Sequence, residues 1–330
     1  MKNNNFTPAS SFGKNTSVDA NYYLEHGFAD VRELISKEMV EYLRDINNQT
    51  KSNSAFDSFK RNTYNVAIED EKILSFIRTE KFADLVKKLG YEDCVFTDGI
   101  IFETDSNSVG FDWHIGVTSF KYIYPEDRAF SIWIALDDVD PEKQDGGMSL
   151  LSTQAFSGHE FYKLQSKVTK SLTEGKYKIP AIFKTVLGPR FRTEEQKKFK
   201  ELYPFIQEKI PHLFSESLYI SGFARNLFDS ESVRYRLAPG DAIAFDKDVF
   251  HKSNRFLPGP QLSRRAFVMR FIDVKSRYNQ VNSDKTGGDV SVLVNKMIAG
   301  NGNHFDIQKG TVIRTTSEVK NDYVYHQKNG

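Results

Sequence analysis

Two of the seven histidines in the chain lie in strand-like segments, and their context could support metal chemistry. His114 lies in FDWHIGVTSF, just after the turn SNSVG, and His251 closes the segment PGDAIAFDKDVFH. Two histidines and one carboxylate form the facial set that holds Fe(II) and leaves positions open for a cosubstrate and oxygen. The carboxylate is commonly two residues after the first histidine, where this chain has Gly116. Either the pair binds no metal, or something other than a protein side chain fills that position.

Asp112 offers an alternative carboxylate. It lies two residues before His114, so on an extended strand the two side chains share one face. A carboxylate displaced in this way would complete a three-ligand iron site and favour a hydroxylase. The usual carboxylate ligand, however, follows the histidine. Our main interpretation is therefore that the ligand position is that of Gly116, which has no side chain.

The segment RRAFVMR carries a second chemical signal. Strand alternation places on one face Arg264, Ala266, Val268 and Arg270, and on the other Arg265, Phe267 and Met269. Two arginines among small apolar residues cannot both be buried without anionic partners. The planar guanidinium matches a carboxylate bidentately, so a barrel interior with two arginines and two histidines predicts a metal and bound anions. The alternative is that the arginines face solvent while Phe267 and Met269 point inward.

The composition narrows the classes of protein that fit. The 45 basic and 44 acidic residues nearly cancel, so the global charge gives no reason to expect nucleic acid or membrane as a partner. The single cysteine, Cys94, excludes an intrachain disulfide and a multi-cysteine metal cage. The polar start lacks the apolar core of a signal peptide, and no apolar run reaches membrane-spanning length. We expect a cytoplasmic protein with a mobile segment at 1–18 and one domain at 19–330.

Helices are predicted first along the chain, followed by strands. Ser36 can cap a helix with the apolar stripe Met39, Val40, Leu43 and Ile46, and a second helical region runs from about Asp70 to Leu89, ending at Gly90. The later segments CVFTDGIIFET, AFSIWIAL, DGGMSLLS, LAPGDAIAFDKDVFH and RRAFVMRFIDV read as short strands between turns. With no helix between successive strands, the pattern favours an antiparallel sandwich or barrel.

The region 160–234 breaks this pattern. It mixes helix-like and irregular stretches and carries more Lys and Arg than Asp and Glu. We interpret it as an insertion that forms a lid or substrate segment over one barrel mouth, because binding surfaces concentrate in such excursions. The alternative is an ordinary solvated helical elaboration.

Five segments, in order, carry a resemblance to a known family: DWHIGVTSF, FSIWIALD, GGMSLLST, PGDAIAFDKDVFH and LSRRAFVMRFID. They resemble the Fe(II)/2-oxoglutarate-dependent halogenases, above all the halogenase domain of the curacin polyketide assembly line, in the branch related to phytanoyl-CoA dioxygenases. The likeness covers about 96–162 and 236–277. It is generic in the helical start, and the insertion carries no motif that matches.

The resemblance implies a mainly β protein with flanking helices, folded as a double-stranded β-helix (jelly roll, cupin-like) with the site inside. His114 and His251 would be the iron ligands. Arg264 matches the arginine that grips the distal carboxylate of 2-oxoglutarate, and Arg270 matches a second arginine near the halide and cosubstrate. The pocket would also be lined by Ser131 and Trp133.

The resemblance also gives a reason for Gly116. Without a carboxylate there, a coordination position opens, and a chloride ion would restore the charge balance. With Fe(II), 2-oxoglutarate, chloride and O2, such an enzyme chlorinates an unactivated carbon. Two alternatives stay open: hydroxylation or desaturation by the same cofactors, and a jelly roll that has lost its metal and binds a ligand or partner.

The substrate class follows from the resemblance only in outline. The curacin-type domain acts on an acyl chain tethered to an acyl carrier protein, so such a carrier is the expected partner. Carrier proteins are acidic, and the basic residues of the insertion, such as Arg190, Arg192, Lys197 and Lys198, offer a docking surface. A free amino acid, fatty acid or alkaloid is the alternative substrate.

Overall fold

The computed structural model describes residues 11–51, 58–66, 69–116, 119–159, 223–279, 291–298 and 304–314. Within them an eight-stranded antiparallel sheet has the order β1-β2-β8-β5-β10-β4-β11, with β3 pairing β4. Its strands are β1 Ser17–Val18, β2 Phe28–Arg32, β3 Arg61–Thr63, β4 Asp93–Thr104, β5 Ala129–Ala135, β8 Ala242–Asp246, β10 Arg264–Asp273 and β11 Thr311–Arg314. A smaller sheet has the order β7-β6-β9, formed by β7 Val233–Arg234, β6 Met148–Leu150 and β9 His251–Ser253.

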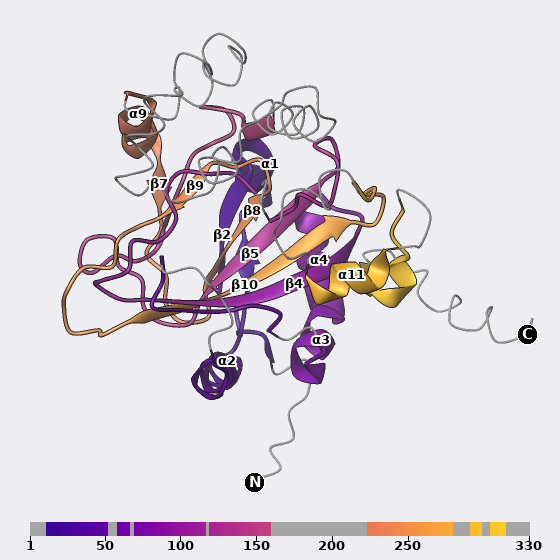
Figure 1. Cartoon of the computed structure of the whole chain (residues 1–330), viewed down its shortest axis with the longest axis horizontal. Helices are drawn as coiled ribbons and strands as arrows, with labels where there is room; N and C mark the ends of the chain where they lie inside the picture. Colours follow the sequence, from indigo (N-terminus) through magenta and orange to yellow (C-terminus); the bar gives the residue numbers. More distant parts are fainter. Residues whose placement is uncertain are drawn as a thin grey trace, which may run out of the picture.

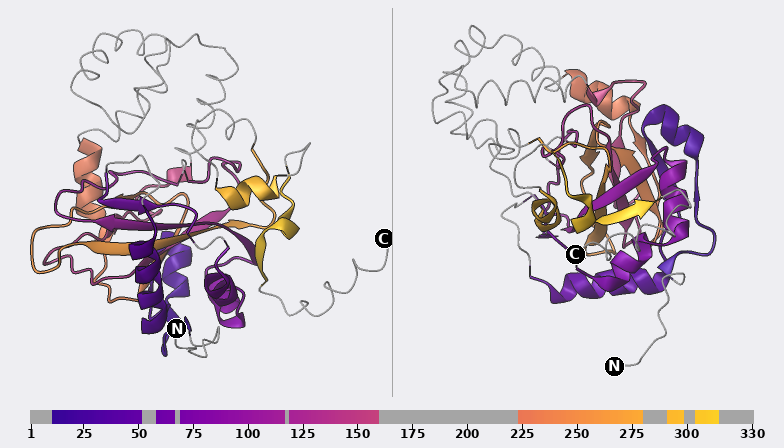
Figure 2. Two further views of the ribbon diagram at one scale, coloured as in Figure 1. Left: turned by 60° about the horizontal axis from the view of Figure 1, so that its bottom comes forward. Right: turned by 90° about the vertical axis from the view of Figure 1, so that its right-hand side faces the viewer.

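Helices flank this pair of sheets. They are α1 Ala20–His26, α2 Lys37–Gln49, α3 Glu71–Ile77, α4 Glu80–Lys88, α9 Phe223–Glu231 and α11 Val292–Met297, with a short 3-10 turn at Ile307–Lys309. The large sheet curls, and α2, α3 and α4 lie along one side of it (Figures 1 and 2). The small sheet and α9 lie at the other end of the molecule (Figure 1).

Local sequence explains where the helices begin and end. The Ser36 side chain accepts a hydrogen bond from the Met39 N–H, so the predicted cap of α2 is confirmed. The single helical region expected from about 70 to 89 is two helices, because Thr79 takes an extended conformation and caps α4 by accepting from the Phe82 N–H. Gly90 follows with a φ of +77°, which glycine adopts without strain.

Both faces of β10 are buried. On the outer face Phe267 and Met269 pack with the apolar stripes of α2 and α3. On the inner face Ala266 and Val268 pack with side chains of β5, β8 and the small sheet. The predicted alternation is therefore confirmed, while the alternative with arginines in solvent is wrong, since Arg264 is only 2% exposed.

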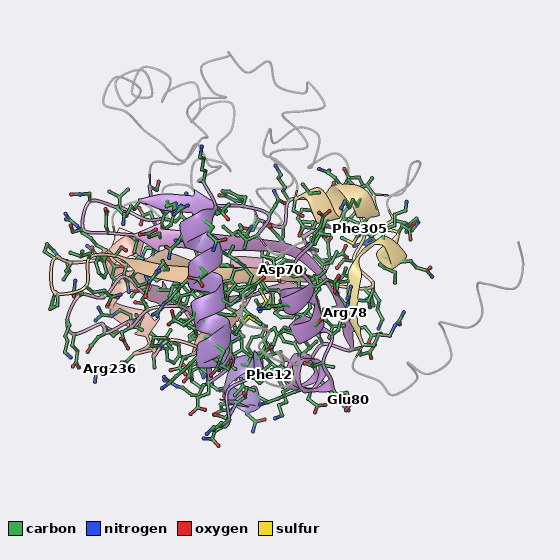
Figure 3. The ribbon with its side chains drawn as sticks, turned by 90° about the horizontal axis from the view of Figure 1, so that it is seen from below. Phe12, Asp70, Arg78, Glu80, Arg236 and Phe305 are labelled. Atoms are coloured by element: carbon green, nitrogen blue, oxygen red, sulfur yellow. The ribbon has the colours of Figure 1, made fainter. Side chains whose placement is uncertain are left out.

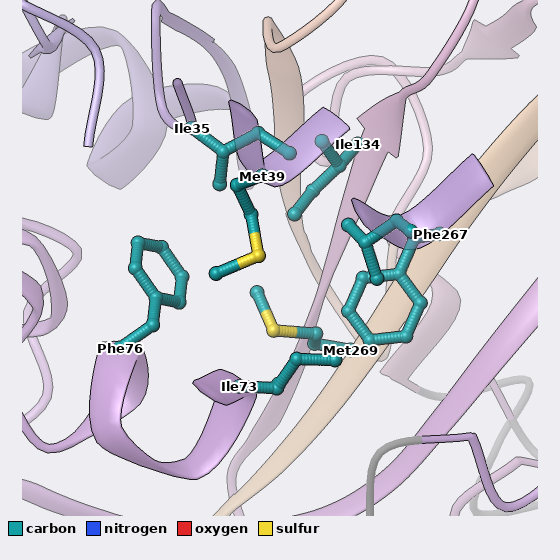
Figure 4. A pocket seen from close by; sticks show the side chains of 8 residues that line it. Ile35, Met39, Ile73, Phe76, Ile134, Phe267 and Met269 are labelled. Carbon is teal, nitrogen blue, oxygen red and sulfur yellow. The ribbon is translucent and has the colours of Figure 1, made fainter. Parts of the chain in front are cut away.

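A small apolar gap lies between the outer face of the large sheet and the helices (Figure 4). It is lined by Ile35, Met39, Leu43, Ile73, Phe76, Ile134, Phe267 and Met269. Its volume of about 10 Å³ could hold at most about one water molecule, and its apolar walls offer a water no hydrogen bond. We therefore regard the gap as a packing imperfection.

Residues 11–18 belong to the packed domain. Phe12 is 6% exposed and packs against Phe76 with ring centroids 4.5 Å apart, on the helical side of the molecule (Figure 3). The Ser11 carbonyl accepts from the Ser36 N–H at 2.7 Å, and Val18 pairs with Val31. The packed domain thus begins no later than Ser11 rather than after residue 18, and residues 1–10 lie outside the described part.

Other expectations about organisation meet the structure only in part. Residues 160–222 of the expected insertion lie outside the described residues, and α9 and β7 form its end. No helix in the described part is long and apolar enough to cross a membrane. Cys94 is buried in β4, where it pairs with Asp273 of β10 and Ile313 of β11.

Candidate functional site

The structure brings His114 and His251 together. Their backbones form one isolated bridge, in which each N–H donates to the other carbonyl at 3.0 and 2.9 Å. The two imidazole centroids are 4.2 Å apart. His251 begins β9, whereas His114 lies in a loop and not in the strand that its sequence suggested. The pair therefore forms without a continuous ladder.

Backbone carbonyls fix the tautomer of both histidines. The Nδ1 of His114 lies 2.6 Å from the Asp112 carbonyl, and the Nδ1 of His251 lies 2.8 Å from the Val249 carbonyl. A carbonyl only accepts, so each Nδ1 carries the proton and each Nε2 keeps its lone pair. Burial lowers the pKa of both imidazoles, and the charge of Arg270 lowers both further. Two neutral imidazoles with oriented rings are what a divalent metal requires.

No third protein ligand accompanies the pair among the described residues. No His, Cys, Asp or Glu within that part of the chain joins them in a group of three that could hold a metal. The Asp112 carboxylate accepts from the Trp113 N–H at 2.9 Å. The described residues therefore do not support a displaced carboxylate at Asp112.

Gly116 lies close to backbone atoms. Its N–H donates to the Lys247 carbonyl at 2.8 Å. A Cβ at this position would lie 2.9 Å from the Phe120 ring and 3.0 Å from the Lys247 carbonyl oxygen, so any side chain would require movement. Packing alone thus gives a reason for glycine, independent of any halide.

Arg264 is the clearest anion-binding group. It is 2% exposed, and its Nε and Nη1 atoms have no hydrogen-bond partner. Its guanidinium lies 5.0 Å from the centre of the Trp133 ring. Burial lowers its pKa to about 10, which still leaves it charged at neutral pH. Because a buried charge with unpaired donors is costly, this position fits an anionic ligand such as a carboxylate, which can accept a hydrogen bond from an unpaired donor.

Arg270 has a protein partner that sequence reasoning missed. It pairs in register with Asp98 of β4, and their Nη1 and Oδ2 atoms are 3.0 Å apart. Burial raises the pKa of Asp98, and the charge of Arg270 opposes that rise. The sequence contained a signal for this pair. Asp98 lies in the middle of the apolar run CVFTDGIIF, and a buried acid needs a cation nearby.

Ser131 and Trp133 line the same inner face. Ser131 pairs in register with Arg270 on one side and with Phe245 on the other. The Phe245 ring centroid lies 4.6 Å from that of His251, which links the sheet face to the histidine pair. Sequence reasoning did not single out Phe245, although its alternation with Ile243 in AIAFD marks an inward position.

Comparisons with known proteins give matches among solved structures. Neither a protein-family model nor a curated protein sequence matches this chain. SnoK, a non-heme alpha ketoglutarate dependent carbocyclase from nogalamycin biosynthesis, is 12% identical with a TM-score of 0.52, over 89% of this chain and 94% of that one. The epimerase SnoN, in complex with Fe3+, alpha ketoglutarate and nogalamycin RO, is 13% identical with a TM-score of 0.52, over 87% and 93%. EctD from S. alaskensis with bound Fe is 13% identical with a TM-score of 0.50, over 88% and 90%.

This chain has the jelly-roll fold of the 2-oxoglutarate-dependent oxygenases. The expected mainly β architecture with flanking helices is thereby confirmed. Within this jelly roll His251 belongs to the small sheet, while Arg264 and Arg270 belong to the large sheet. The candidate site therefore lies between the two sheets. Likeness at 12–13% identity establishes the fold, and the reaction has to be argued from the site.

Proposed function

We propose that this protein is an Fe(II)/2-oxoglutarate-dependent enzyme that chlorinates an unactivated aliphatic carbon. One observation carries the proposal: two neutral histidines and a buried, unpaired arginine share the jelly-roll interior, without a third protein ligand in the described residues. A site with two protein ligands leaves a coordination position for an anion from solution.

Each residue has a distinct role in this proposal. The Nε2 atoms of His114 and His251 would hold the iron, since both Nδ1 atoms are engaged by backbone carbonyls. Arg264 would bind the distal carboxylate of 2-oxoglutarate, since its guanidinium has donors without a protein partner. Ser131 and Trp133 would line the cosubstrate pocket. When bound, iron with 2-oxoglutarate and oxygen supplies the oxidising power that breaks the C–H bond.

The overall stoichiometry closes with chloride as the halogen source. The substrate C–H, 2-oxoglutarate, O2, chloride and one proton give the C–Cl product, succinate, CO2 and water. Arg270 uses Nη1 for Asp98, and its other N–H groups could attract the halide to the interior. We keep a carrier-tethered acyl chain as the expected substrate, and the basic residues proposed to dock its carrier, such as Arg190 and Lys197, lie outside the described part.

A second candidate is oxidation without a halide, such as hydroxylation or desaturation. The surroundings of Gly116 favour it, because the glycine can be explained by the approach of Phe120 and Lys247 alone. SnoN and SnoK, which share the fold, are described as an epimerase and a carbocyclase. Only the fate of the substrate carbon separates the two candidates.

Mass spectrometry of the products tests this choice. The protein would be loaded with Fe(II) under anaerobic conditions, then given 2-oxoglutarate, chloride and candidate acyl-carrier substrates before oxygen is admitted. A product with the chlorine isotope pattern, replaced by the bromine pattern when bromide is supplied, supports halogenation. An oxygenated product that is indifferent to halide supports the second candidate. Succinate formation with neither product would direct the search to other substrates.

The iron ligands are tested by His114→Ala and His251→Ala. Each should abolish tight Fe(II) binding, because a site with two protein ligands cannot spare one. His304→Ala, at an exposed histidine, is the control and should bind iron as the parent does. Undiminished iron stoichiometry in both site variants would remove the ligand assignment, and absence of iron binding by the parent would favour a jelly roll that has lost its metal.

Gly116→Asp and Gly116→Ala together test whether the missing side chain serves the halide. Both variants add a Cβ that must displace Phe120 or the Lys247 backbone, but only aspartate adds a carboxylate. If the position admits chloride, Gly116→Asp should lose chlorinated product while it still binds iron, and Gly116→Ala should keep part of the activity. Equal loss of iron binding in both variants would show that packing alone requires the glycine. Asp112→Asn should bind iron normally, and loss of iron there would revive the displaced carboxylate.

A further inference from the structure

Helix α9 contacts the residues beside both histidines. Because side chains alternate along an extended chain, the neighbours of an inward-facing histidine point outward. Trp113 precedes His114, and Lys252 follows His251. The Trp113 Nε1–H donates to Asp229 Oδ1 of α9 at 2.8 Å, and Lys252 Nζ pairs with the same oxygen. Lys252 also lies 5.2 Å from the centre of the Trp113 ring.

An apolar cluster holds the helix against these same segments. Phe228 of α9 is 3% exposed, and its ring lies 5.5 Å from that of Trp113 and 5.2 Å from that of Phe250, the residue before His251. Ile115 and Leu151 complete the buried cluster, with Phe156 packed against it. Figure 1 shows α9 beside β7 and β9. Thus α9 packs on the side of the histidine bridge that faces away from the interior.

The histidine bridge needs such support. His114 and His251 come from distant parts of the sequence. One pair of backbone hydrogen bonds joins the two residues, and single bonds from the Ser253 N–H to the Phe111 carbonyl and from the Gly116 N–H to the Lys247 carbonyl join their segments on either side. His114 belongs to no strand, and β9 has only three residues. With no third protein ligand among the described residues, the separation of the two Nε2 atoms depends on these few backbone bonds and on the packing around the two segments.

We propose that Asp229 is a positioning residue for the metal site. By binding Trp113 and Lys252 with one carboxylate oxygen, it fixes the two chain segments against each other and so fixes the spacing of His114 and His251. The inference rests on the proposed iron site. It predicts that a half-exposed side chain, which does not face the interior, controls metal affinity.

Cobalt(II) binding measures this role, because its visible spectrum reports ligand geometry without turnover. Asp229→Ala should weaken Co(II) binding to the full-length protein about 10- to 100-fold, as is usual when a residue that orients metal ligands is removed, and should alter the spectrum. Asp229→Asn keeps an acceptor for the Trp113 indole and should lose less. Glu231→Gln removes a carboxylate from the same helix and should match the parent.

Hydrogen exchange of the metal-free protein supplies an independent readout. Asp229→Ala should speed the exchange of the His114 and His251 amides, which donate across the bridge, and Glu231→Gln should not. Parental exchange at both amides, or faster exchange with unchanged Co(II) affinity and spectrum, overturns the positioning role. Failure of the parent to bind Co(II) through its histidines would instead overturn the proposed iron site, a result that His114→Ala makes distinguishable.

Discussion

Arg264 carries a full charge where almost no water reaches it. The stacked Trp133 ring and the nearby charges of Asp137 and Asp145 offset part of the cost of burial. They leave Nε and Nη1 without hydrogen bonds, however, and unmade bonds to a buried cation are expensive. Binding of a ligand carboxylate would supply missing hydrogen bonds and so stabilise the buried charge.

Arg264→Lys tests this at the residue scale. Lysine keeps the charge but cannot donate in parallel to both carboxylate oxygens. Loss of one hydrogen bond to a charged group, about 1.5–3 kcal/mol, should raise the Kd for 2-oxoglutarate about 10- to 100-fold by anaerobic titration. Arg265→Lys is the matched control, because Arg265 is held bidentately by Asp137 on the other face. Parental 2-oxoglutarate affinity in Arg264→Lys would mean that the cosubstrate anchor lies elsewhere.

At the scale of elements, strand β10 shows what the sequence could predict. Alternation in RRAFVMR correctly assigned Arg264 and Arg270 to one face, because a period of two follows from strand geometry alone. Burial of the opposite face could not be foreseen, since it depends on α2 and α3, which come from far earlier in the chain. The sequence pattern predicts which side chains share a face of the strand, but it does not predict which elements pack on that face.

The same limit applies to the residues of the candidate site. Each histidine could be selected from its own segment, but their backbone bridge is a contact between distant segments. Asp98 and Asp229 were missed for that reason. The first becomes meaningful only opposite Arg270, and the second only once α9 packs on the bridge. Sequence patterns predict features within one segment, but they do not predict contacts between distant segments.

The cap of α2 gives a prediction at this scale. Ser36→Ala removes the acceptor for the Met39 N–H and should lower the free energy of unfolding by about 1 kcal/mol. Because α2 packs on the outer face of the sheet, 2-oxoglutarate binding on the inner face should be unchanged. Denaturant titration alongside ligand titration checks both. A cosubstrate defect in Ser36→Ala would show that the two faces are coupled.

For the whole molecule, the large sheet acts as a wall between two apolar cores, one against the helices and one against the small sheet. Several ionisable groups lie close together at the end of β8, which belongs to the large sheet. Asp246 accepts from the Tyr91 hydroxyl at 3.2 Å, near Asp248 and Arg128. Burial, followed by the charge of Asp248, raises the pKa of Asp246 from 3.8 to about 6.

This raised pKa predicts a pH dependence of global stability. The folded state holds the Asp246 proton more tightly than the unfolded state, so its contribution is complete below pH 4 and is lost as pH rises through about 6. The loss should be about 2–3 kcal/mol. Asp246→Asn should flatten the curve of unfolding free energy between these pH values, as measured by urea titration. Identical slopes in parent and variant would count against the assignment.

Cys94 allows the opening of the large sheet at β4 to be measured. It is the only thiol in the chain, it is buried between β10 and β11, and burial raises its pKa. A thiol reagent can therefore react only when β4 separates from a neighbour, because the reactive thiolate forms in water. At low reagent concentration the labelling rate gives the free energy of that separation. Because ligands that bind only the folded protein suppress such openings, slower labelling with cobalt and 2-oxoglutarate would register binding of both without any substrate.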